Sequence, residues 1–166
     1  LLFSILTPIF VKYPQFNVEI FGSGGYASVR DLDKVIQPIK DRVRFWGYQG
    51  DVATIYRQLD YLLTGLPEKE ALGLNIIEAQ ACGTPVLAPK APPFIETILD
   101  EVTGFFYSDP RADDGRSFGE LLGKLLTLPM KLDPLQATGH LNKFSLDSFT
   151  RRIEPIVGWA NKELSK

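Results

Sequence analysis

The sequence predicts an α/β domain with a doubly wound, mainly parallel sheet and helices on both faces. Two observations predict this class. Short apolar runs that end at or near glycine alternate with stretches of helical periodicity, as in successive βα units. The 166 residues, of which 45% are hydrophobic, are enough for one globular domain with a core. We therefore treat residues 1–166 as a single domain.

The first half of the chain contains three of the expected strands, at 18–21, 43–46 and 61–64. Helical periodicity precedes or separates them. Leu2, Ile5 and Ile9 fall on one stripe of a helix over 1–10, which we expect to pack on the sheet, and further helices are expected at 31–40 and 53–59. Asp51 stands where the last of these needs an N-cap. The chain begins inside the first helical pattern, as if a longer polypeptide had been cut.

The second half repeats this alternation. A helix over 74–82, with Leu74, Ile77 and Ala81 as its apolar positions, is expected to end at Gly83. The other expected elements are strands at 86–88 and 104–107 and helices at 94–100, around 121–126 and over 145–164, and we expect a mobile charged loop at 109–116.

Composition excludes several classes of protein. Lys and Arg number 18 against 20 Asp and Glu, and this net charge of −2 argues against nucleic acid as a partner. One cysteine and one histidine can form neither an intrachain disulfide nor the usual zinc site, so no metal site is expected. The low cysteine content is typical of a reducing compartment, which favours the cytoplasm. No apolar run reaches the roughly 18 residues of a membrane-spanning helix.

The glycines after the first strand offer one candidate site. Residues 22–27 match the pattern G-x-G-x-x-[GA], which would suggest a dinucleotide-binding turn. However, the next helix begins only near Asp31, and Asp41 precedes the next strand instead of ending it. A plain glycine turn beside some other ligand is therefore favoured over a nicotinamide or flavin site.

The segment that begins at Glu70 is the strongest feature. Glu70 and Glu78 bracket a loop that leads into a helix, and eight helical residues advance ~12 Å. The free N–H groups of Gly73, Leu74 and Asn75 at the helix start suit an anion, while the carboxylates suit sugar hydroxyls. For two acids alone, the simpler alternative is favoured: Glu70 beside the positive end of the helix dipole and Glu78 on a solvated face.

Residues 70–88 resemble a known signature. They match most fixed positions of E-G-F-G-L-x-x-x-E-A-x-A-x-G-x-P-V-x-A, the pattern of retaining, nucleotide-sugar-dependent glycosyltransferases of the GT-B fold, family 4 or group 1. Residues 21–24, 43–48 and 96–105 are similar to further segments of this family, and the final helices are placed like its C-terminal helix, which crosses back toward the other domain. The resemblance covers nearly the whole chain.

The resemblance implies a Rossmann-like half of a GT-B fold and assigns roles to residues. Glu78 matches the acid that holds the nucleotide's ribose, and Glu70 the catalytic-site acid near the donor sugar and its anomeric centre. Gly73, Leu74 and Asn75 match the helix start whose amides take the distal phosphate. The other positions that it places at the donor site are Ala71, Leu72, Gly22 and Gly24, with Phe45, Trp46 and Tyr48 in the region that packs on the base.

Some positions depart from the family pattern. Ala71 and Leu72 replace its glycine and aromatic residue, and Pro92 and Pro93 replace paired glycines. The family's first strand, its basic phosphate-binding segment and its N-terminal acceptor domain are absent. His140 has no partner acid at a readable spacing and is expected to lie on the surface or cap a helix.

The resemblance therefore implies the donor-binding, C-terminal half of an enzyme that transfers a sugar from an NDP-sugar to an acceptor hydroxyl with retention. It implies no metal or other cofactor, a missing N-terminal domain as partner, and weak nucleotide binding without catalysis for this half alone. The family's acceptors include lipids, polysaccharides and small molecules, which leaves the acceptor and peripheral membrane association open. The alternatives are a non-catalytic nucleotide-sugar-binding module and, less favoured, an NAD-dependent oxidoreductase domain.

Overall fold

The computed structural model describes residues 2–22, 32–66 and 71–164. Its strands form two parallel sheets. β1 (Val18–Phe21) pairs with β2 (Val43–Gly47), and β4 (Val86–Pro89) lies between β3 (Leu62–Leu63) and β5 (Gly104–Tyr107). Every one of these pairings is parallel, as the alternating sequence pattern predicts.

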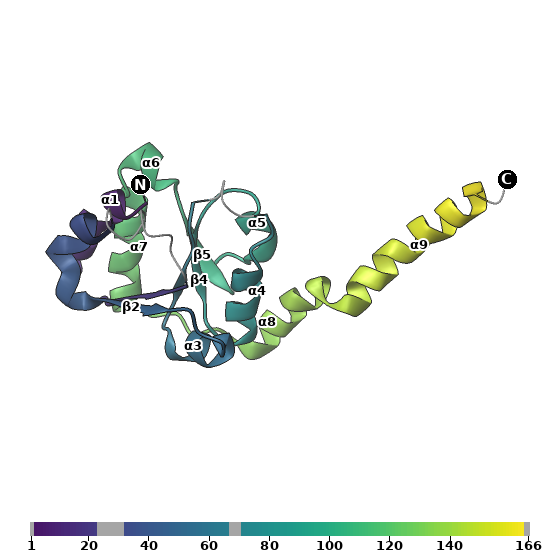
Figure 1. Cartoon of the computed structure of the whole chain (residues 1–166), viewed down its shortest axis with the longest axis horizontal. Helices are drawn as coiled ribbons and strands as arrows, with labels where there is room; N and C mark the ends of the chain where they lie inside the picture. The colour runs from purple at the N-terminus through teal and green to yellow at the C-terminus, as the bar shows by residue number, and fades with distance from the viewer. Residues whose placement is uncertain (1, 23–31, 67–70, 165–166) are drawn as a thin grey trace.

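Helices cover both faces of the β3–β4–β5 sheet (Figure 1). On one face, Leu87 of β4 packs with α1 (Leu2–Lys12) and α7 (Arg116–Thr127). On the other, its neighbours Val86 and Ala88 pack with α3 (Val52–Gln58), α4 (Leu74–Ala81) and α5 (Phe94–Thr97). Because successive strand residues point to opposite faces, this division confirms the doubly wound arrangement.

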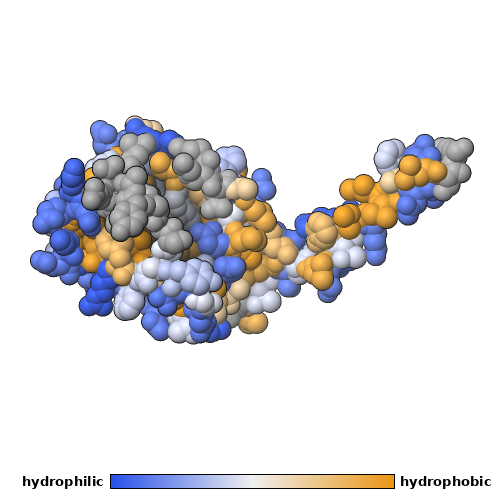
Figure 2. Space-filling view, viewed as in Figure 1, coloured by the Kyte–Doolittle hydropathy of each residue, from blue (hydrophilic) through white to orange (hydrophobic). Residues whose placement is uncertain are grey.

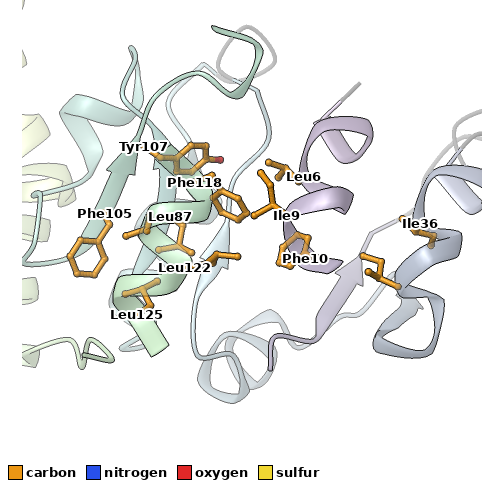
Figure 3. Packing of buried hydrophobic residues seen from close by; sticks show 12 residues of the cluster. Leu6, Ile9, Phe10, Ile36, Leu87, Phe105, Tyr107, Phe118, Leu122 and Leu125 are labelled. Carbon is orange, nitrogen blue, oxygen red and sulfur yellow. The ribbon is translucent and has the colours of Figure 1, made fainter. Parts of the chain in front are cut away.

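The larger core cluster joins the two sheets through α1. Ile9 and Phe10 of α1 face Phe118 of α7 (Figure 3), and the rings of Phe10 and Phe118 meet edge to face with centroids 5.7 Å apart. Val18 of β1 packs against the same cluster as Leu87 of β4. The predicted helix at 1–10 is thus confirmed as a helix buried against the sheets.

Arg42 fixes the end of α1. Its guanidinium donates to the backbone oxygens of Phe10 at 2.8 Å and Phe16 at 2.7 Å. Arg42 ends η1 (Gln37–Arg42), a 3₁₀ helix that follows helical residues 32–36. These bonds hold the turn between α1 and β1.

The predicted apolar face of α4 is wrong. Leu74 is 65% exposed and Ala81 is also exposed, whereas Ile76, Ala79 and Gln80 are buried. The buried amide of Gln80 explains part of the difference between the predicted and the observed buried face of α4. Its Nε2 donates to the backbone oxygen of Thr97 at 2.9 Å, so this polar side chain is satisfied in the core.

Three short helical segments were missed from the sequence. The loop expected at 109–116 contains α6 (Pro110–Asp113), and the polar stretch before the final helix contains α8 (Pro134–Leu141) and η3 (Asn142–Phe144). His140 lies on α8, with Nε2 2.9 Å from the backbone oxygen of Thr97. It therefore anchors α8 to α5.

The chain ends in α9 (Leu146–Leu164), which extends away from the rest of the molecule (Figure 1). None of its described residues is buried. Apolar side chains lie along it (Figure 2), and the large exposed ones are Leu146, Phe149, Ile156, Val157, Trp159 and Leu164.

Candidate functional site

The start of α4 presents free backbone donors. Gly73 precedes the helix with φ +76°, a left-handed conformation that suits glycine, and its oxygen accepts from the N–H groups of Ile76 and Ile77. Among the described residues, the N–H groups of Leu74 and Asn75 have no acceptor, and no acidic residue lies in the first turn. This end of α4 therefore offers unpaired donors and the positive end of the helix dipole to an anion.

Glu78 lies one turn further along α4, and its side chain is exposed. Its Oε2 accepts a hydrogen bond from the hydroxyl of Tyr56 on α3, with the two oxygens 3.2 Å apart. Within the described residues, no group donates to Oε1. One oxygen of the carboxylate is thus fixed by the protein, and the other is available to a ligand.

Tyr56 is a functional candidate that sequence reasoning missed. Burial, reinforced by the Glu78 carboxylate, raises the pKa of Tyr56 to about 12, so it remains a hydrogen-bond donor at neutral pH. Its backbone oxygen also accepts a bond from the hydroxyl of Thr84. In the sequence, Tyr56 is simply one apolar position of a short helix, and nothing there distinguishes it from a core residue.

The carboxyl ends of two strands meet α4 along a groove of about 650 Å³. Phe21 at the end of β1, Gly65 just after β3 and Asn75 in the first turn of α4 all line it. Ligands of open parallel sheets collect outside this edge. Asn75 is therefore a predicted site residue that the structure places at the expected edge.

The predicted base-binding residues lie on and after β2. Trp46 stacks on Phe21 with ring centroids 6.3 Å apart, and its indole N–H donates to the Glu19 carboxylate. Phe45 and Trp46 are consecutive strand residues and face opposite sides of the sheet, so they do not form one platform. Tyr48 follows the strand and is 80% exposed.

The remaining predicted site residues have mixed outcomes. Gly22 has φ +111° and donates to the backbone oxygen of Gly47 at 2.9 Å, which closes the end of β1 on β2. Ala71 and Leu72 are exposed immediately before Gly73. Glu70 and Gly24 lie outside the described residues. Of the others, the structure brings together Gly73, Leu74, Asn75 and Glu78 at the start and first turns of α4.

Among the described residues, no group of three or more His, Cys, Asp or Glu side chains is arranged to hold a metal ion. No helix in the described part of the chain is both long and apolar enough to cross a bilayer.

The chain is similar in sequence to curated proteins that include a glycosyltransferase and a synthase. The chain is 32% identical over 126 residues to a D-inositol 3-phosphate glycosyltransferase of Actinosynnema mirum, a match that covers 74% of this chain and 29% of that protein. It is 40% identical over 67 residues to an N-acetyl-alpha-D-glucosaminyl L-malate synthase of Bacillus anthracis, which covers 40% of this chain and 17% of that protein. The chain thus spans less than a third of these relatives.

Solved structures share the fold. HepE of Anabaena in complex with UDP superposes with a TM-score of 0.76 over 93% of this chain and 44% of that protein, at 20% identity. The sucrose-phosphate synthase of Thermosynechococcus elongatus superposes with a TM-score of 0.78 over 97% of this chain and 42% of that protein, also at 20% identity. This chain shares its fold with these proteins, which confirms the predicted Rossmann-like α/β half of a GT-B fold.

A family model supports the same assignment across most of the sequence. The model described as "Glycosyl transferases group 1" matches residues 5–134, which include both sheets and all of α4. The resemblance to group 1 glycosyltransferases, inferred from the segment that begins at Glu70, is therefore confirmed. This match leaves no support for the oxidoreductase alternative. The chain belongs to the group 1 glycosyltransferases.

Proposed function

We propose that this chain is the donor-binding half of a retaining glycosyltransferase, which transfers a sugar from an NDP-sugar to an acceptor hydroxyl. One observation carries the proposal: the unpaired amides at the start of α4 lie one turn from Glu78, a carboxylate with one oxygen fixed by Tyr56. A ligand with an anionic centre and neighbouring hydroxyls fits this pair of groups. Similar structures support it, since HepE is known in complex with UDP and with UDP-glucose.

Each group has a distinct task in this proposal. The amides of Gly73, Leu74 and Asn75 bind the distal phosphate and stabilise the charge that develops on the leaving diphosphate. Glu78 accepts hydrogen bonds from the ribose hydroxyls. Glu70 binds the sugar hydroxyls, and its negative charge stabilises the positive charge that develops at the sugar ring in the transition state.

The other parts of the proposal concern the whole enzyme. We place the base near the segment of Phe45, Trp46 and Tyr48. Gly22, Gly24, Ala71 and Leu72 lie at the donor site in this proposal. The chemistry needs no metal, the acceptor binds to a separate N-terminal domain, and the isolated chain binds nucleotide weakly without turnover. We place the enzyme in the cytoplasm.

The variant Glu78→Ala tests the nucleotide site. It removes a charge-assisted hydrogen bond worth about 1.5–3 kcal/mol, so the affinity for UDP or GDP should fall roughly 10- to 100-fold in calorimetric titration. The melting temperature should fall only slightly, because the side chain is exposed and the variant loses a single hydrogen bond, the one from Tyr56.

Glu154→Ala is the matched control, since Glu154 is an exposed glutamate on α9. It should leave the nucleotide affinity unchanged. Undiminished nucleotide binding by Glu78→Ala would contradict the proposed role of this carboxylate.

A further inference from the structure

The loop of residues 90–93, between β4 and α5, carries one charged side chain. Lys90 immediately follows β4 and is exposed. An exposed lysine is ordinarily no more than a solvated charge. Its position relative to the start of α4, the backbone of its loop and the surroundings of its ammonium indicate a more specific task.

Lys90 lies at the same end of the sheet as the start of α4. The chain passes from α4 into β4 through residues 82–85. Ile76 of α4 packs in one cluster with Val86 and Ala88 of β4, so the two elements lie side by side and run in opposite directions (Figure 1). The eight residues of α4 span about 12 Å and the four residues of β4 about 13 Å, so the end of β4 reaches the level of the helix start.

The packing of α5 holds this loop beside α4. Phe94, the first residue of α5, is buried in the same cluster as Ile76. Near the other ends of the two helices, Gln80 donates through Nε2 to the backbone oxygen of Thr97 at 2.9 Å. The helices therefore run in the same direction, and the loop that precedes α5 lies toward the start of α4.

The backbone of residues 90–93 offers no hydrogen-bond donor to a ligand. The N–H of Lys90 donates to the last backbone oxygen of β5 at 2.8 Å, and the N–H of Ala91 donates to the last backbone oxygen of β4 at 2.8 Å. The other two residues, Pro92 and Pro93, have no N–H. The loop can therefore help to bind an anion at the start of α4 only through the side chain of Lys90.

The ammonium of Lys90 is available for such a contact. Within the described residues it forms no ion pair, whereas Arg111 is paired with Asp109 and Lys124 with Glu101. Lysine carries three donors on a flexible four-carbon stem, so its charge can follow a phosphate that binds beside it.

We propose that Lys90 binds the diphosphate of the donor beside the amides at the start of α4. The inference rests on the proposed function, because it needs the donor's phosphates at that helix start. The amides contribute hydrogen bonds and partial charges, and Lys90 adds a full positive charge. Because negative charge grows on the leaving diphosphate during transfer, the same ammonium stabilises the leaving group.

The test compares ligands that differ only in the diphosphate: UDP with uridine, and GDP with guanosine. Their affinities for the chain and for its Lys90→Gln and Lys90→Arg variants are measured by NMR titration at low salt. We expect Lys90→Gln to bind the preferred diphosphate about three- to tenfold more weakly and its nucleoside unchanged. Lys90→Arg, which keeps the charge, should stay within about twofold of the parent chain. At about 0.3 M salt the loss should shrink, because the charge is screened.

Lys131→Gln is the matched control for the change in net charge. Lys131 is exposed, and the N–H of its neighbour Met130 donates to the hydroxyl of Tyr61, which precedes β3. It therefore lies on the side of the amino end of β3, away from the start of α4. Lys131→Gln should leave the affinities for diphosphate and nucleoside unchanged.

Three results would overturn the inference: an undiminished affinity of Lys90→Gln for the diphosphate, an equal loss in Lys131→Gln, or an equal loss for the nucleoside. Glu78→Ala separates this inference from the proposed function, since loss of a ribose contact should weaken diphosphate and nucleoside alike. If Glu78→Ala weakens both while Lys90→Gln changes neither, only the role of Lys90 fails. If Glu78→Ala changes neither, the proposed nucleotide site fails.

Discussion

Gly104 is the position where a single methyl group would be most disruptive. A Cβ atom there would lie 2.2 Å from the backbone oxygen of Val86, its partner across β4 and β5. Gly104→Ala should therefore destabilise the fold by about 2 kcal/mol or more, measured by urea unfolding.

Gly139→Ala is the control for this prediction. A Cβ at Gly139 on α8 meets nothing within 4 Å, and alanine favours a helix, so stability should rise by up to about 1 kcal/mol. Equal effects of the two substitutions would show that the contact with Val86 is relieved by a small shift of the strands.

Tyr56→Phe tests whether Tyr56 positions Glu78. Loss of the hydroxyl removes one hydrogen bond of about 0.5–1.5 kcal/mol, so the affinity for UDP should fall roughly two- to tenfold. In a double-mutant cycle, Tyr56→Phe should cause no further loss of UDP affinity in the Glu78→Ala background.

Tyr61→Phe serves as the comparison, because the Tyr61 hydroxyl accepts from the backbone N–H of Met130 at 3.0 Å, remote in sequence from Glu78. It should lower stability without changing nucleotide affinity. If Tyr56→Phe lowered nucleotide affinity by the same factor in the Glu78→Ala background, this would contradict the inference that Tyr56 positions Glu78.

At the scale of elements, the stability that α8 contributes to the fold should depend on pH through His140. Burial, reinforced by the charge of Lys143, lowers the pKa of His140 below its ordinary 6.5, against the opposing effect of the Thr97 carbonyl. The unfolded chain therefore binds this proton more readily than the folded one. The stabilisation is present above pH 6.5 and is lost as the pH falls below it.

We expect the melting temperature to fall between pH 7.5 and 5.5, and to fall less in His140→Gln. The carboxylates of Asp51, Glu101 and Asp109, whose pKa values are lowered by hydrogen bonds, lose their contribution at more acidic pH. An identical decline in His140→Gln and the parent chain over this interval would assign the pH dependence to other groups.

The missed helices show how far the sequence could predict these elements. α6 and α8 each begin with Asp-Pro, and Asp109 and Asp133 accept from the backbone N–H two residues later. An N-cap aspartate followed by proline is a helix-start signal that could have located both. This signal was outweighed by the charge of residues 109–116, which contain α6, and by the polarity of the stretch that contains α8.

The site was predictable where local backbone chemistry determines it. Gly73 at the start of α4 and Asp51 as the N-cap of α3 follow from residue type and spacing, and the structure confirms both positions as helix starts. The buried face of α4 and the bond between Tyr56 and Glu78 depend on how separate helices pack. Gln80 shows the difficulty, because a polar residue becomes a core residue through a partner 17 positions away.

At the scale of the whole molecule, α9 is separable from the folded body. None of its described residues is buried, and it extends away from the sheets (Figure 1). A chain that ends at Ser145 should therefore melt within about 2 °C of the parent in calorimetry, because little apolar surface is lost from the core.

Leu122→Ala provides the contrast, since Leu122 is 1% exposed in the core between α1 and α7. It should cost about 2–5 kcal/mol. A large loss of stability on removal of α9 would mean that the helix folds back onto the body in solution.

The bridging position of α1 determines how heat should unfold the body of the protein. In the described residues the two sheets share a side-chain core that includes Ile9 and Phe10, but no ladder of backbone hydrogen bonds. Neither sheet can lose that shared core without exposing the apolar surface of the other. The body should therefore melt as one cooperative unit, with equal calorimetric and van't Hoff enthalpies.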